Sequence, residues 1–162
     1  MINRILNGVL LVLLVTFVAC TAKKEETVVA PVDKEQIKKM IQDKENHYAE
    51  LYSKGDLGKI DYYADDAIVF AQNKKMLVGK DSIQAYLKEG LEASSPGNKI
   101  SFITDDIYVF NDANQVLEIG SFRLVDSVDV MINSGHYMIL FEKRDGKYVS
   151  VREMSTSDIP LE

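Results

Sequence analysis

The sequence predicts an α+β domain in which helices come first and a sheet follows. Apolar side chains recur about every 3.6 residues through the first part of the folded region, which is typical of helices. After Asn98, four long strand-like runs follow one another, separated by short turns. This order indicates a meander of antiparallel strands packed on helices rather than alternating β–α units.

Length and composition fit a single domain of this kind. Of the 162 residues, 46% are hydrophobic and 27% are charged, a balance that argues against disorder. The formal net charge is −6, and no run of basic residues is longer than Lys23-Lys24. We therefore expect no nucleic-acid partner. Because Cys20 is the single cysteine, the chain cannot form an internal disulfide.

The first nineteen residues differ from the rest and predict an export signal. Arg4 precedes an apolar stretch over residues 5–19, which is shorter than the roughly 20 residues that span a bilayer. The stretch ends in Phe17-Val18-Ala19-Cys20 and resembles the lipobox of bacterial lipoproteins. The resemblance implies that Cys20 becomes the lipidated first residue and anchors the protein in a membrane of the bacterial envelope. Residues 20–32 are then predicted to be a flexible tether.

About three helices are expected before the main strands. The first runs from an N-cap at Asp33 to a stop at Gly55, since Asp favours helix starts and Gly favours helix ends. A short second helix is predicted over residues 56–63 and a strand over residues 67–72. The third helix is predicted over residues 80–93, directly after a glycine.

The four strand-like runs cover residues 99–110, 115–127, 130–144 and 147–157, and Asp145-Gly146 is a hairpin signal. The third run is apolar on both sides. One side carries His136, Met138 and Leu140, and the other carries Tyr137, Ile139 and Phe141. We expect the first side to face the helices and the second to meet another subunit, since the chain has few elements left for a further layer.

Three segments together resemble the nuclear transport factor 2-like superfamily, in its SnoaL-like and uncharacterised bacterial branch. They are Gly55-Asp56 followed by Tyr63-Ala64-Asp65-Asp66-Ala67, then Gly79-Lys80-Asp81, and finally Asp145-Gly146-Lys147-Tyr148. The resemblance covers residues 33–162 as one domain. It implies a cone-shaped, strongly curved antiparallel sheet packed on about three N-terminal helices, with an internal cavity and often a homodimer formed through the sheet.

The resemblance also implies which side chains line that cavity. We expect the pocket to be lined by Tyr48, Tyr52, Phe70, His136, Met138, Val151, Glu153 and Ser155, although the same residues could instead form a filled core. His136 is the best catalytic candidate, because an imidazole exchanges protons near neutral pH. Glu153 would pair with it, and Tyr48 would donate to an oxyanion.

The chemistry of ketosteroid isomerase, a member of the superfamily, does not transfer to this chain. That enzyme needs a tyrosine, an aspartate base and a second acid. Tyr48 falls at the tyrosine position, but the base position is Ala71 and the second acid position is Met138. Without a base in reach, an isomerase route is not expected.

These observations predict an envelope lipoprotein that binds a small, mostly apolar ligand or serves as a dimeric accessory module, without catalysis. The first alternative is a cofactor-free SnoaL-like enzyme that uses His136, Glu153 and Tyr48. The second is a protein-interaction module that uses the outer face of the sheet. We expect no cofactor and no metal site, because His47 and His136 lie on separate elements without a recognised ligand spacing.

Overall fold

The computed structural model describes residues 32–160. The predicted signal segment, Cys20 and the tether as far as residue 31 lie outside the described residues. Within residues 32–160, no helix is both long enough and apolar enough to cross a membrane.

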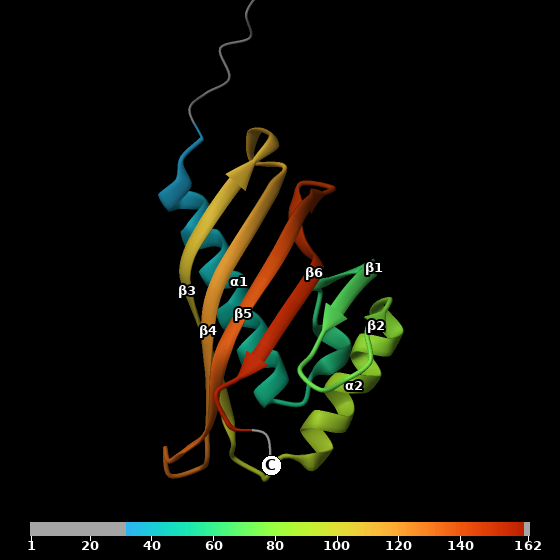
Figure 1. The fold of residues 1–162 in the computed structure, drawn as a ribbon, viewed down its shortest axis with the longest axis vertical. Helices are drawn as coiled ribbons and strands as arrows, with labels where there is room; N and C mark the ends of the chain where they lie inside the picture. Colours follow the sequence, from blue (N-terminus) through green and yellow to red (C-terminus); the bar gives the residue numbers. More distant parts are fainter. Residues whose placement is uncertain (1–31, 161–162) are drawn as a thin grey trace, which may run out of the picture.

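Two α-helices lie on the same side of one sheet (Figure 1). Helix α1 (Lys34–Ser53) begins where predicted, and the Asp33 side chain accepts a hydrogen bond from the Gln36 amide at 3.0 Å. Gly55 follows the helix with φ +75°, a left-handed conformation that favours glycine. Helix α2 (Lys80–Ala93) also has the predicted bounds.

The predicted second helix over residues 56–63 is wrong. Only one 3₁₀ turn, η1 (Leu57–Lys59), forms there, and strand β1 (Tyr63–Phe70) begins four residues earlier than expected. The cause is tertiary, because the Ser150 amide donates to the Tyr62 carbonyl at 2.8 Å and draws the segment into the sheet. Burial of Tyr62 and Tyr63 beside α1 supports the same conformation.

The sheet has six strands in the order β2-β1-β6-β5-β4-β3. The remaining strands are β2 (Leu77–Val78), β3 (Lys99–Phe110), β4 (Gln115–Val125), β5 (Met131–Arg144) and β6 (Lys147–Ser157). The four long strands therefore confirm the predicted runs to within two residues. The sheet is mixed rather than wholly antiparallel, since β1 pairs with β6 in the parallel direction.

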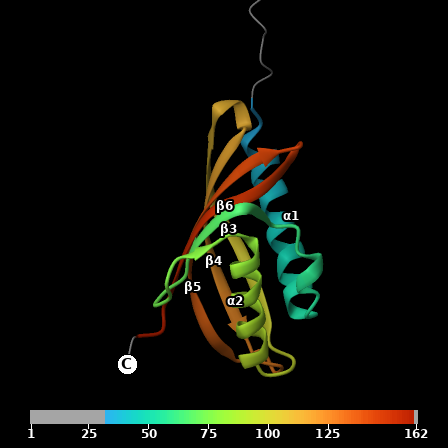
Figure 2. The ribbon, with the colours of Figure 1, turned by 90° about the vertical axis from the view of Figure 1, so that its right-hand side faces the viewer.

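The sheet bends around the helices, so that its concave face meets α1 and α2 (Figure 2). One cross-strand row of the concave face is formed by Ile107, Glu118, Ile139, Glu153 and Val69. Close packing on this face depends on Gly120, where an added Cβ would lie 2.2 Å from the Tyr137 ring. Glycine is thus required at that point of β4.

The two faces of β5 are reversed from the prediction. Tyr137, Ile139 and Phe141 are buried on the concave face, with exposed fractions of 4%, 3% and 0%. The His136 side chain is 68% exposed on the outer face, and Met138 on the same face is 45% exposed. Both sides of β5 are apolar, so the alternation of its residues does not show which side faces the helices. A shift of the strand by one residue exchanges all inward-facing and outward-facing side chains.

Candidate functional site

A cavity of about 250 Å³ lies between the concave face of the sheet, α1 and α2. Helix α2 contributes Ile83, Leu87 and Gly90, and β1 contributes Val69. Half of the remaining lining residues are aromatic, namely Tyr48, Tyr52, Tyr62, Tyr63, Tyr86, Phe102, Phe122 and Tyr137. A mostly apolar wall with a few polar groups is typical of a small-molecule site.

The cavity has an opening near the C-terminal end of the described chain. Tyr86, Phe122, Asn133 and Ser155 line both the cavity and a shallower neighbouring hollow. Ile159 and Pro160 line only the hollow. The four shared residues therefore mark the route between the interior and solvent.

Four of the eight predicted pocket residues line the cavity, namely Tyr48, Tyr52, Glu153 and Ser155. Three others, Phe70, His136 and Met138, lie exposed on the outer face of the sheet and not in the cavity. Val151 is buried but does not line the cavity, because it is the extra residue of a bulge where Leu140 pairs with Arg152 and Phe141 with Ser150.

The structure does not bring the three candidate catalytic residues together. Tyr48 and Glu153 face the same cavity, whereas the imidazole of His136 lies outside, 4.0 Å from Asp158. The predicted pairing of His136 with Glu153 is therefore wrong, and its cause is the reversed phase of β5 described above.

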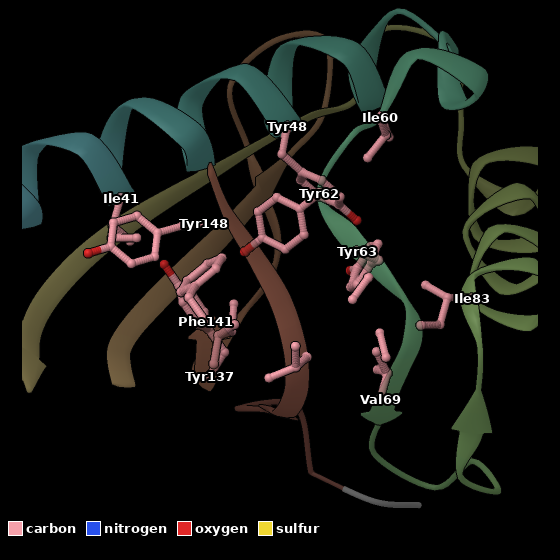
Figure 3. Close-up of a cluster of buried hydrophobic side chains, with 14 of the residues drawn as sticks. Ile41, Tyr48, Ile60, Tyr62, Tyr63, Val69, Ile83, Tyr137, Phe141 and Tyr148 are labelled. Carbon is pink, nitrogen blue, oxygen red and sulfur yellow. The ribbon is translucent and has the colours of Figure 1, made fainter. Parts of the chain in front are cut away.

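A cluster of three tyrosines forms the wall between α1 and β1. The ring centroids of Tyr48 and Tyr62 are 4.8 Å apart, and those of Tyr62 and Tyr63 are 4.9 Å apart. Figure 3 shows Tyr48 reaching from α1 toward the two tyrosines at the start of β1. Tilted and edge-on contacts of this kind favour a fixed arrangement of the rings.

Two buried glutamates join α1 to the sheet beside this cluster. Glu45 on α1 is 1% exposed and accepts a hydrogen bond from the Tyr62 hydroxyl. Glu118 on β4 is fully buried and accepts from the hydroxyls of Thr104 at 2.6 Å and Tyr137 at 3.1 Å. Neither glutamate was expected from the sequence as part of the site.

Glu45 and Glu118 lie in different environments, so one of the two carboxyls keeps its proton to a higher pH than the other. Burial raises the pKa of Glu45 well above its usual value, and the nearby charge of Glu118 adds to the rise. Burial also raises the pKa of Glu118, but hydrogen bonds from Thr104 and Tyr137 oppose that effect. We therefore assign the proton of the pair to Glu45 and the charge to Glu118.

Glu153 on β6 is the third acid and the one that faces the cavity. Its side chain is half-buried, since one side borders the cavity, but Oε2 is shut off from solvent. Within the described chain this oxygen has no hydrogen-bond partner. Burial raises the pKa of Glu153 to about 7, although hydrogen bonding from Tyr63 opposes the rise and the charge of Glu118 adds to it. The carboxyl can therefore accept or donate a hydrogen bond near neutral pH.

The two missed glutamates carried recognisable signals. Glu45 follows Ile41 by four residues and precedes Tyr48 by three, so it falls on the apolar stripe of its helix. Glu118 lies between Val116 and Gly120 in an alternating strand, on the same side as both. An acid on an apolar face predicts a buried carboxyl.

Comparison with known proteins establishes the fold. Neither any protein-family model nor any curated protein matches the sequence. Among solved structures, a domain of unknown function with a cystatin-like fold from Nostoc punctiforme has a TM-score of 0.65 at 14% identity, covering 79% of each chain. A nuclear transport factor 2-like protein of unknown function from Shewanella oneidensis has a TM-score of 0.58 at 21% identity, covering 75% of this chain and 96% of that one.

A ketosteroid isomerase-like protein from Erwinia carotovora is also similar, with a TM-score of 0.56 at 15% identity, covering 75% of this chain and 96% of that one. These similarities confirm the predicted α+β fold of the nuclear transport factor 2-like, or cystatin-like, type. At such identities they define the fold and not an activity, because this fold hosts many functions.

The raised pKa of Glu153 predicts how stability depends on pH. Between about pH 4.5 and 7 the unfolded chain has lost this proton and the folded chain still holds it, so stability falls as pH rises through this window. A pKa moved from 4.5 to about 7 corresponds to about 3 kcal/mol. Glu153→Gln removes this effect, and urea denaturation should show the variant gaining up to that amount on the wild type between about pH 4.5 and 8.

The matched control is Glu92→Gln, since the Glu92 side chain on α2 is 68% exposed. This variant should keep the pH dependence of the wild type. If Glu153→Gln also keeps it, Glu153 does not titrate in the way described.

Proposed function

We propose that this protein is a lipid-anchored protein of the bacterial envelope whose single domain binds a small, mostly apolar ligand, without catalysis. The observation that supports binding is the cavity of about 250 Å³ between the sheet and the two helices. Its wall is largely aromatic and aliphatic, and its polar groups include Glu153, Ser155 and Asn133. A filled core would leave no such volume, because protein interiors pack without voids much larger than a water molecule.

The geometry favours binding over the enzyme alternative. The imidazole of His136 lies on the far side of the sheet from the cavity, so the proposed trio of His136, Glu153 and Tyr48 does not form. The isomerase base position, Ala71, lines the cavity but has no titratable group, and Met138 at the second acid position points outward. The polar groups that remain can orient a ligand.

Filling the cavity should abolish binding. Ala71 is 8% exposed and lines the cavity, so Ala71→Phe places a ring in the space that the ligand would occupy. Native mass spectrometry of protein purified from its own cells should show a retained small molecule on the wild type and none on this variant.

Ala85→Phe is the matched control, because Ala85 lies on the exposed side of α2. This variant should keep the ligand. A wild-type protein that carries no small molecule, or an Ala71→Phe variant that is folded and keeps it, would contradict the proposed binding function.

The proposed anchor is supported by the position of Cys20 at the end of the apolar segment. Mass spectrometry of the protein extracted from membranes should show a chain that begins at Cys20 and carries acyl chains. Cys20→Ala should abolish the acyl mass, whereas the neighbouring Thr21→Ala should retain it. A membrane-extracted wild-type chain with an unmodified Cys20 would show that the anchor proposal is wrong.

We now propose the partner surface on the face of β5 that carries Met138, because that face is the exposed one. Phe70, Met154, Met138 and Ile119 are neighbours in one cross-strand row of the outer face. Three of them are strongly exposed, Phe70 at 41%, Met154 at 52% and Met138 at 45%. Charged groups of both signs lie near this row, because Arg152 is two residues before Met154 on β6 and Asp158, just after β6, lies 4.0 Å from the imidazole of His136. An apolar row with charges of both signs nearby can pair with its own copy across a two-fold axis, so we propose a homodimer through this row.

Met138→Glu should separate the dimer, because it places a charge in the centre of the row. Sedimentation velocity should show a dimer for the wild type and a monomer for the variant. Met40→Glu is the control, since Met40 is similarly exposed, at 48%, on α1. A monomeric wild type would refute the self-association and leave the row to another protein.

A further inference from the structure

The charged side chains that line the cavity are all acidic. Two carboxyls, Glu45 and Glu153, line it, and a third, Glu118, lies next to Glu45. Among the described residues that line the cavity there is no Lys, Arg or His. Two lysine ammonium groups lie over rings of the cavity wall, that of Lys44 at 5.3 Å from the centroid of the Tyr62 ring and that of Lys74 at 6.0 Å from the centroid of the Tyr86 ring, but neither lysine lines the cavity.

The carboxyl of Glu153 is only partly hydrogen-bonded, with Tyr63 as its donor. Its Oε2 is buried and has no partner within residues 32–160, and the residue lines the cavity. Oε2 of Glu118 also has no partner there, but Glu118 does not line the cavity, so Glu153 is the carboxyl that combines an unpartnered oxygen with a place in the cavity wall. A buried carboxylate oxygen without a donor is costly, and a donor brought in by a ligand would remove that cost.

The aromatic wall adds a second attraction for positive charge. Tyr48, Tyr63, Tyr86, Phe102 and Phe122 all border the cavity. An aromatic face attracts an ammonium group held within about 6 Å, by about 0.5–2 kcal/mol once water is excluded. Aromatic rings together with a carboxylate are the combination that selects organic cations over neutral molecules of the same shape.

We propose that the ligand of this cavity is a small hydrophobic amine whose ammonium group donates to Glu153 and whose apolar part packs against the tyrosine and phenylalanine rings. This inference rests on the proposed binding function and specifies its ligand class. The volume of about 250 Å³ limits the ligand to about the size of one ring with a short side chain.

Binding of such an amine requires the charged form of Glu153. The ionisable groups that face Glu153, named with their elements, are Tyr48 and Glu45 on α1, Tyr62 and Tyr63 at the start of β1, Tyr86 on α2, and Glu118 on β4. All of them are neutral or negative near neutral pH, so none repels an ammonium group. Amine binding should therefore strengthen as pH rises through about 7.

The test compares benzylamine with benzyl alcohol, which has nearly the same shape and no charge. Isothermal titration calorimetry of the full-length protein in a non-ionic detergent gives both affinities at about pH 5.5 and pH 8. At the higher pH, benzylamine should bind about tenfold more tightly or better. The preference should shrink at the lower pH and disappear in Glu153→Gln, with benzyl alcohol binding unchanged.

Two further variants make the result specific. Glu153→Asp keeps the carboxyl and should keep part of the preference for benzylamine, which separates loss of charge from damage to the fold. Glu92→Gln removes an exposed carboxyl from α2 and should change neither affinity.

The outcomes separate the two proposals. Equal binding of both compounds, or a preference that survives in Glu153→Gln, overturns the amine assignment and leaves the binding function intact. Binding of neither compound also overturns the amine assignment. The retained-ligand measurement on the wild type and Ala71→Phe then decides the binding function independently.

Discussion

The hydrogen-bonded link from Tyr62 through Glu45 to Glu118 is the interaction on which the interior of this protein depends. It joins three elements that are distant in sequence, since Tyr62 precedes β1, Glu45 lies on α1 and Glu118 lies on β4. The link fixes the rotation of α1 on the concave face, because Glu45 can meet Tyr62 and Glu118 only from one side of the helix. With α1 held in this way, Tyr48 is placed in the cavity wall.

Such a link carries a thermodynamic cost. Carboxyls are rarely buried without a countercharge, and replacing a buried polar group by an apolar one often stabilises a protein. Three carboxyls on one side of a small core, Glu45, Glu118 and Glu153, therefore indicate selection for something other than stability. Glu45 and Glu118 each accept hydroxyl hydrogen bonds at one oxygen, whereas Oε2 of Glu118 and Oε2 of Glu153 have no partner within the described residues. Of the three, Glu153 alone both has an unpartnered oxygen within the described residues and lines the cavity, and the site therefore centres on it.

The fold was largely readable from the sequence, and the site only in part. Asp33, Gly55 and Asp145-Gly146 placed element boundaries correctly, because caps and tight turns are set by local chemistry. The segment after Gly55 was misread as a helix, because its conformation is set by pairing with β6 rather than by its own residues.

The residues of β5 alone also do not show which of its two faces points inward. His136, Met138 and Leu140 are as consistent with burial as Tyr137, Ile139 and Phe141, and the choice is made by the contact of Tyr137 with Gly120 on the neighbouring strand. Tyr48 was placed correctly because it lies on the apolar stripe of α1, whereas Glu153 faces the cavity because the bulge at Val151 changes which side of β6 points inward. A glycine that pairs with a large aromatic residue on the next strand, as Gly120 does with Tyr137, is the sequence pattern that would have shown which side of β5 faces inward.

The location of the opening has a consequence for a tethered molecule. Tyr86, Phe122, Asn133 and Ser155 surround it, at the end of the domain where the chain finishes (Figure 1). Helix α1 starts at the opposite end, where any attachment through the N-terminal segment would pull. Attachment through the N-terminal segment would therefore leave the opening uncovered, because the two lie at opposite ends of the domain.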